Sequence, residues 1–384
     1  MNEIVNIIIV GDLFPVPSNF SAFEKGNIER LFGDKICHLF QKADLRICNL
    51  EGALTDGNDK CIKTGPIVTA PTSTVQTLCS MGIDCCTLAN NHITDGGYQG
   101  VLNTINTLNK RGIKHIGAGK DEDSIRHHIN YHVKGINICL YNVCETMYNA
   151  PSKIHPGAYL YDEYIVCKEL ESLRTQSDYL IVIYHGGAEK FRYPSPQTKK
   201  RFHRMVDSGA NMILSQHTHC VGCEEYYKDA YLLYGQGNFL FRSFNNEFTD
   251  TGLIIEIEVG ENVTIKKHLV NAIEDTVRYD EKQDFTEFDK RSALINDEDF
   301  IMEQYQRYTL SELHKYLIAY KSKFPGRWLL RRFFQKAYIK YLLSHAYDTK
   351  DLLFTLHSLR SEQNRETVIH GLENHLRNKY DTDF

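Results

Sequence analysis

Six residues of types that commonly bind metal ions stand in five separate segments of the chain. They are two carboxylates, one carboxamide and three histidines: Asp12, Glu51, Asn91, His185, His217 and His219. Mixed nitrogen and oxygen donors suit divalent transition ions such as Mn, Fe or Zn, whereas calcium prefers oxygen donors alone. The alternative is that each histidine is an ordinary core or surface residue. Considered together, the six residues favour metal binding.

The stretch "LANNHITDGG", residues 88–97, places Asn91 and His92 shortly before a pair of glycines. Asparagine and glycine interrupt both helices and strands, so the stretch by itself predicts only a polar loop. The His-x-His spacing of residues 217 and 219 would let two imidazoles on one turn reach the ions from adjacent directions.

Each of these residues stands at the end of a predicted β-strand. Apolar runs predict strands at 4–10, 44–51, 83–92, 179–187 and 211–219, and helical patterns occur at 27–42, 72–81 and 98–111. This alternation predicts an α/β domain with a largely parallel sheet. Because the carboxyl ends of parallel strands share one edge of a sheet, we expect the six side chains to meet there.

The remaining patterns predict antiparallel strands followed by helices. Short alternating runs at 129–143 and hairpin-like pairs at 224–234 and 252–270 indicate antiparallel pairing. From about residue 285, glycine becomes scarce and leucine, tyrosine and charged residues recur at helical spacing. The sequence therefore predicts a first domain over residues 1–280 and a C-terminal α-helical subdomain over residues 285–384.

Composition restricts the partners and the compartment. The formal net charge of −5 gives no general attraction to nucleic acid. The N-terminus lacks the basic segment of a signal peptide, and the 11 cysteines then indicate free thiols in a reducing, cytoplasmic environment. Residues 319–345 contain seven Lys or Arg and no acid. Such a helix could contact an anionic membrane, but packing on neighbouring helices is favoured.

The order of seven motifs closely resembles the capsule-synthesis protein CapA family, a branch of the calcineurin-like metallophosphoesterase superfamily. The motifs are "GDLFP" (11–15), "ADLRICNLEGALTD" (43–56), "LANNHITDGGYQGVLNTINTL" (88–108), "GAGKD" (117–121), "YHGGAE" (184–189), "SGANMILSQHTHCVGCEEY" (208–226) and "LLYGQGNFLF" (232–241). The resemblance covers about residues 4–270. It implies an α/β four-layer αββα sandwich of the metallophosphoesterase type, followed by the helical subdomain.

The resemblance also implies a role for each residue. Asp12 and His219 would hold a first divalent ion, while Asn91, His185 and His217 would hold a second. Glu51 stands where the superfamily has its bridging carboxylate. His92 would face the substrate, where it would stabilise the transition state or protonate the leaving oxygen.

Two departures from the superfamily pattern concern the first ion. The superfamily has a histidine two residues after the first aspartate, but Phe14 stands there, and Glu51 is longer than the usual bridging aspartate. We therefore expect the first ion to be weakly held. Weaker candidates for contact with an anionic substrate are Lys63, Thr64, Arg192 and Asn238.

These features predict a binuclear-metal hydrolase that acts on a phosphate ester or a related anionic bond in capsule or exopolymer synthesis. Its substrate would be an anionic small molecule or polymer, and its partner the envelope-polymer synthesis machinery. The alternative is a non-catalytic, metal-containing accessory protein that binds an anionic polymer or its synthase. The presence of His92 favours the enzyme, because a binding protein has little use for that residue.

Overall fold

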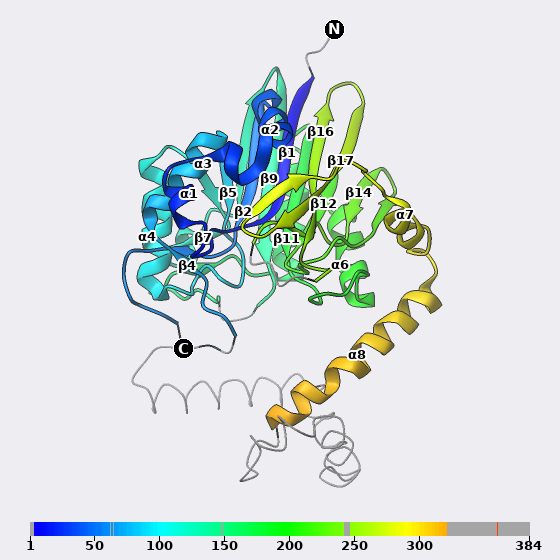
Figure 1. Cartoon of the computed structure of the whole chain (residues 1–384). Helices are drawn as coiled ribbons and strands as arrows, with labels where there is room; N and C mark the ends of the chain where they lie inside the picture. Colours follow the sequence, from blue (N-terminus) through cyan, green and yellow to red (C-terminus); the bar gives the residue numbers. More distant parts are fainter. Residues whose placement is uncertain are drawn as a thin grey trace. The chain divides into compact units, whose positions relative to one another are not determined.

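Two mixed β-sheets form the centre of the part of the chain that the structure describes (Figure 1). The structure is a computed structural model that describes residues 4–320, apart from 62, 64, 147–148 and 242–245, together with Leu359. The chain divides into two compact units, Met1–Arg307 and Tyr308–Phe384.

The first sheet has strand order β18-β17-β16-β1-β2-β5-β6, and a short strand, β15, also pairs with β1. Its strands are β1 (Val5–Leu13), β2 (Leu45–Leu50), β5 (Cys85–Thr87), β6 (Lys114–Ile116), β15 (Asn238–Leu240), β16 (Thr251–Val259), β17 (Val263–Ile273) and β18 (Thr276–Tyr279). β1, β2, β5 and β6 are parallel, whereas β16, β17 and β18 add antiparallel strands on the other side of β1.

The second sheet has strand order β13-β14-β12-β11-β9-β8. Its strands are β8 (His128–Val133), β9 (Ile136–Cys144), β11 (Tyr179–His185), β12 (Met212–Gln216), β13 (Glu224–Tyr227) and β14 (Ala230–Leu233). β9, β11, β12 and β14 are parallel, and β8 and β13 are antiparallel to their neighbours. Two further strand pairs are β3 (Ala53–Leu54) with β4 (Thr69–Ala70), and β7 (Ala118–Gly119) with β10 (Gly157–Ala158).

Helices connect the strands. They are α1 (Phe20–Glu24), α2 (Ile28–Lys42), α3 (Val75–Met81), α4 (Gly97–Lys110), α5 (Glu163–Arg174), α6 (Pro196–Asp207), α7 (Thr286–Ala293) and α8 (Glu298–Tyr320), with 3₁₀ turns η1 (Thr72–Thr74) and η2 (Glu122–Ser124). Local sequence explains several starts. Asp162 and Ser195 cap α5 and α6 by accepting hydrogen bonds from the backbone amides of Ile165 and Thr198.

Three hydrophobic clusters separate the layers. The first lies between the first sheet and helices α1–α4, the second between the two sheets, and the third between the second sheet and helices α5 and α6. In Figure 1, α1, α3 and α4 gather on one side of the strands and α6 lies on the other. The layer order is therefore helix, sheet, sheet, helix, which confirms the predicted αββα sandwich.

Alternation along the buried strands fills these clusters. In β1, Ile7 faces the second sheet and Ile8 faces the helices, and in β11, Ile181 and Val182 divide in the same way. Strands covered on both faces need apolar residues at almost every position, as the run "IIIV" at residues 7–10 shows.

The predicted strands and the observed ones differ mainly at their ends. The strand predicted at 4–10 continues to Leu13, because Asp12 and Leu13 pair with both β2 and β15. The strand predicted at 83–92 stops at Thr87, so Asn91 and His92 lie in the loop that follows β5. The antiparallel pairs predicted near 129–143, 224–234 and 252–270 are confirmed.

The first compact unit includes α7 and the start of α8, which the sequence analysis assigned to the helical subdomain. Phe288 of α7 packs in the cluster between the sheets, and Ile295 and Ile301 pack against the second sheet. The predicted basic helix at 319–345 lies almost wholly outside the described residues. Among the helices that are described, none has the length and apolar character needed to cross a membrane. All 11 cysteines are free thiols, as predicted.

Candidate metal centre

Both sheets contribute to one buried group of side chains at the carboxyl ends of their parallel strands. We call this group the candidate metal cluster; it comprises Asp12, Glu51, Asn91, His185, His217 and His219. Asp12 lies near the end of β1, Glu51 directly follows β2, and Asn91 follows β5, so the first sheet supplies the oxygen donors. His185 ends β11, and His217 and His219 follow β12, so the second sheet supplies the imidazoles. The predicted convergence is therefore what the structure shows.

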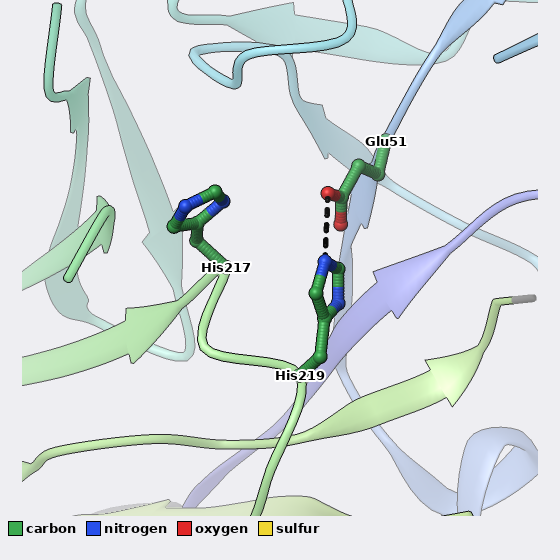
Figure 2. A group of neighbouring side chains, drawn as sticks. All are labelled: Glu51, His217 and His219. Atoms are coloured by element: carbon green, nitrogen blue, oxygen red, sulfur yellow. Dashed lines mark ion pairs between the residues drawn. The ribbon is translucent and has the colours of Figure 1, made fainter. Parts of the chain in front are cut away.

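Glu51 lies at the centre of the cluster. Its Oε1 is 3.7 Å from His185 Nε2 and 4.0 Å from His219 Nε2. Figure 2 shows Glu51 facing the loop that carries His217 and His219, with its ion pair to His219 drawn as a dashed line. Two sets of possible ligands can be distinguished, Asp12 with Glu51 and His185, and Glu51 with His217 and His219. Glu51 belongs to both, which is the property expected of a bridging carboxylate.

The grouping differs in part from the one that the resemblance implied, which placed Asp12 with His219 and His185 with His217. Both arrangements involve close contacts. Asp12 Oδ2 lies 3.3 Å from His219 Nδ1, and the rings of His185 and His217 lie 4.9 Å apart. Asn91 Oδ1 is 2.9 Å from His185 Nε2. The six side chains thus form one continuous cluster.

The loop after β12 holds its two histidines in an uncommon backbone conformation. His217 has φ of 85° and His219 has φ of 54°, both in the left-handed region that residues other than glycine rarely adopt. Such conformations cost about 1–3 kcal/mol each. Here they direct two imidazoles two residues apart towards the same carboxylate.

Burial controls the protonation of the histidines and the carboxylates. Burial lowers the pKa of His217 to about 3 and that of His185 well below its ordinary value, so both rings are neutral near pH 7. Burial also raises the pKa of Glu51 well above its ordinary value, and the negative charge of Asp12 adds to this rise. Burial also acts to raise the pKa of Asp12, but the close approach of His219, together with His185 and Glu51, outweighs burial and holds that pKa low. Two carboxylates in one dry site need a cation nearby if both are to ionise.

The donor atoms of the cluster and their separations fit the binding of divalent metal ions. Three polar atoms of the cluster are buried and have no hydrogen-bond partner: Asp12 Oδ2, Glu51 Oε1 and His217 Nδ1. Buried polar atoms are rarely left unpaired, so three in one cluster need an explanation. Metal–ligand bonds of about 2.0–2.2 Å place two donors of one ion roughly 3 to 4.3 Å apart. The separations of 3.7 and 4.0 Å between Glu51 Oε1 and the Nε2 atoms of His185 and His219 fall in that range.

His92 lies beside the cluster, and contacts on the side of its ring away from the cluster fix its orientation. Its Nδ1 is 2.7 Å from Asp95 Oδ2, and its Nε2 is 4.0 Å from Glu51 Oε1. Lys63 also bonds to Asp95, and its Nζ lies 3.0 Å from His92 Nδ1. The Lys63 side chain is only 3% exposed, so it lies behind His92 rather than on the open loop expected from the sequence.

The other weak candidates fall in different places. Asn238 is buried behind His219: its Oδ1 lies 2.9 Å from His219 Nδ1, and its Nδ2 donates to Thr249 O. Arg192 donates hydrogen bonds to the backbone oxygens of Val221 and Glu247 and lies over the Phe248 ring. Thr64 lies outside the described residues.

Three residues next to the cluster were missed by the sequence analysis: Asn49, Asp95 and Glu145. Glu145 directly follows β9, and its Oε1 is 3.9 Å from His217 Nε2. The strand-end criterion that found the other residues would have found it too. Asp95 had a weaker signal, its place three residues after His92, and Asn49 lies inside a strand, where nothing distinguished it.

The fold and the site together define a four-layer α/β protein with a candidate binuclear metal centre between its sheets. A comparison with protein families then matches residues 6–243 to the family described as "Bacterial capsule synthesis protein PGA_cap". The chain belongs to this family, and the resemblance deduced from its motifs is confirmed.

Two curated relatives carry related names. The chain is 25% identical over 193 residues to the capsule biosynthesis protein CapA of Bacillus anthracis. This alignment covers 49% of this chain and 47% of that protein. The chain is also 27% identical over 183 residues to the PGA biosynthesis protein CapA of Bacillus subtilis (strain 168). That alignment covers 47% of this chain and 48% of that protein. The chain thus spans about half the length of these relatives.

Solved structures give weaker similarities. A phosphatase from Mycoplasma pneumoniae has a TM-score of 0.44 at 16% identity and covers 75% of this chain and 100% of that chain. A 5'-nucleotidase precursor from Thermus thermophilus has a TM-score of 0.42 at 12% identity and covers 81% of this chain and 59% of that chain.

Proposed function

We propose that this chain is a hydrolase with two divalent metal ions, which cleaves a phosphate ester or a related anionic bond in the synthesis of a capsule or another envelope polymer. The observation that carries the proposal is the environment of Glu51. Its Oε1 is fully buried, accepts no hydrogen bond, and faces the ring nitrogens of His185 and His219. A buried carboxylate oxygen that faces imidazole nitrogens and accepts no hydrogen bond is the arrangement that a pair of ions would satisfy.

The cluster residues would hold the two ions, with Glu51 shared between them. When bound, such ions supply Lewis acidity, which polarises a phosphoryl oxygen and makes hydroxide available near neutral pH. The lowered pKa of His185 and of His217 keeps both rings neutral, and neutral imidazole is the form that binds metal.

His92 would act on the substrate. Asp95 Oδ2 lies at hydrogen-bond distance from His92 Nδ1, which holds the ring so that Nε2 faces the cluster. From there Nε2–H can stabilise charge on a transferring group or give its proton to the leaving oxygen. Lys63 supports this arrangement through its own bond to Asp95.

The family and its relatives support the biological setting of the proposal. The printed names of the two Bacillus relatives refer to capsule and PGA biosynthesis. We infer an anionic substrate, either a small molecule or a polymer segment, and an association with envelope-polymer synthesis in the cytoplasm. Mn, Fe or Zn suit the donor set, and the ion nearest Asp12 would be the weaker one, because Phe14 replaces a histidine ligand.

An activity screen tests the proposal. Metal-free protein would be assayed with and without added Mn²⁺ against phosphomonoesters, phosphodiesters and γ-glutamyl amides. We expect metal-dependent hydrolysis in at least one class. His217→Ala should abolish it, whereas His132→Ala should not, because His132 lies at the surface and bonds only to Asn137 among the described residues. Two bound ions without hydrolysis of any of these substrates would favour the accessory protein instead.

A further inference from the structure

Asn49 lies beneath the candidate metal cluster and belongs to none of the ligand sets. It is the second-last residue of β2, is 1% exposed, and pairs across the sheet with Asp12 of β1. The side chain of a buried asparagine has an NH₂ group that donates hydrogen bonds and an oxygen that accepts them. Which of the two faces the neighbouring carboxylates therefore decides whether the side chain can bond to them.

Backbone groups fix the orientation of the Asn90 side chain, which in turn fixes the orientation of Asn49. Asn90 Oδ1 accepts a hydrogen bond from the amide of His92 at 3.1 Å, and Asn90 Nδ2 donates to Leu50 O at 2.9 Å. A backbone amide can only donate and a carbonyl can only accept, so the Asn90 side chain cannot be reversed without losing both bonds.

Asn90 in turn orients Asn49. Asn90 Nδ2 donates to Asn49 Oδ1 at 3.1 Å, which turns Asn49 Nδ2 towards the cluster. There Nδ2 donates to Asp12 Oδ1 at 2.8 Å and to Glu51 Oε2 at 3.4 Å. It also lies 3.4 Å from His185 Nδ1. One amide group therefore contacts one oxygen of each carboxylate.

The other oxygen of each carboxylate has no hydrogen-bond partner. Asn49 contacts Asp12 Oδ1 and Glu51 Oε2, while Asp12 Oδ2 and Glu51 Oε1 are buried and accept no hydrogen bond. We propose that Asn49 is a positioning residue that withholds one oxygen of each carboxylate, so that the ions bind through Asp12 Oδ2 and share the single oxygen Glu51 Oε1. This inference rests on the proposed metal site.

A purely structural role for Asn49 makes a different prediction. If its amide only satisfied buried carboxylate oxygens, its loss would lower stability and leave the mode of ion binding unchanged. Asn142 provides a matched control. It is also a buried asparagine with 1% exposure, but among the described residues its side chain bonds only to backbone groups: it accepts from the amide of Ala89 and donates to Ile183 O.

The experiment loads the full chain with Mn²⁺ and measures ion affinity together with electron paramagnetic resonance. Two Mn²⁺ ions held close together by a shared ligand are magnetically coupled, whereas ions that lie far apart are not. We expect a coupled signal in the wild type. In Asn49→Leu we expect affinity to fall by about 10- to 100-fold, the usual effect of losing a group that orients a ligand, and the coupled signal to be lost. Asn142→Leu should keep the coupled signal even if it melts at a lower temperature.

Asn49→Leu with unchanged affinity and coupling would overturn the inference, as would equal losses in Asn49→Leu and Asn142→Leu. If Asn49→Leu does not fold, an infrared measurement on the wild type still tests the proposal. The infrared difference spectrum on Mn²⁺ binding should show the wide separation of carboxylate stretches that one-oxygen binding produces; a narrow separation would contradict the proposal. A wild type that binds no ions would instead refute the metal site itself.

Discussion

At the scale of single residues, protonation of the histidines makes the stability of the metal-free protein depend on pH. Burial lowers the pKa of His217 to about 3 from an ordinary value of 6.5. As the pH falls below about 6.5, the unfolded chain binds a proton at this residue and the folded chain does not, so stability decreases until about pH 3.

The test compares the wild type with His217→Gln. We expect the free energy of unfolding of the wild type, measured by denaturant titration with chelator present, to fall more steeply between about pH 6.5 and 5 than that of the variant. The raised pKa of Glu51 acts in the opposite direction in both proteins, so the comparison isolates His217. Equal slopes would show that His217 is not held neutral by burial.

His92 should be separable from ion binding. Its Nε2 faces Glu51 at 4.0 Å, but its orientation depends on Asp95, which lies outside the candidate metal cluster. We expect His92→Ala to keep both ions while turnover falls by about a hundred- to a thousandfold, the typical effect of removing one transition-state group. Metal analysis after purification, together with kinetic assays, checks this. Loss of an ion in the variant would place His92 among the ligands.

At the scale of elements, the approach of β15 to β1 positions Asp12 beside Asn238. Gly11 permits it, because a Cβ at that position would lie 2.3 Å from Gly237 O. We expect Gly11→Ala to cost about 1–3 kcal/mol of stability and to weaken ion binding, because Asp12 must move. Gly260→Ala is the control, since its Cβ would meet Ile4 at an ordinary 3.4 Å. Thermal unfolding and metal titration of both variants decide the matter; equal behaviour would refute the role of Gly11.

The same strand shows what sequence patterns can and cannot predict. The apolar run at 4–10 identified β1, and residue type at the predicted strand ends identified six side chains that converge in the structure, because buried strands restrict residue choice strongly and polar side chains stand out where they end. The extension to Leu13 was missed, since it depends on pairing with β2 and with β15, a strand more than 200 residues away. Asn49 was missed for a related reason, because its role depends on Asp12 and Asn90 in neighbouring segments.

The position of Phe14 shows whether a histidine there could strengthen the first ion site. Phe14 stands where the resemblance implies a histidine ligand of that ion. The side chain is 1% exposed and packs in the cluster between the first sheet and the helices, where it contacts the α-carbon region of Gly52. We therefore expect Phe14→His to bury a polar ring among apolar side chains and to lower stability, rather than to create a stronger site.

At the scale of the whole molecule, the two ions would connect the two sheets. Asp12 and Glu51 belong to the first sheet and the three histidines to the second, so ion binding adds links across the apolar interface. A ligand that binds only the folded state stabilises it by about 2.7 kcal/mol at roughly 100 times its dissociation constant. Mn²⁺ should therefore raise the midpoint of thermal unfolding, and a chelator should reverse the effect. The same rise in His132→Ala would show that a surface histidine makes no contribution to it.

The central claim is that two ions at this cluster perform hydrolysis, and one titration tests it most directly. Metal-free protein receives increasing Mn²⁺, and bound ions and hydrolysis of the best substrate from the screen are measured in the same samples. We expect hydrolysis to be absent with one tightly bound ion per chain and to rise as the second, weaker ion binds. Full hydrolysis in the presence of chelator, or two tightly bound ions with no hydrolysis, would contradict it.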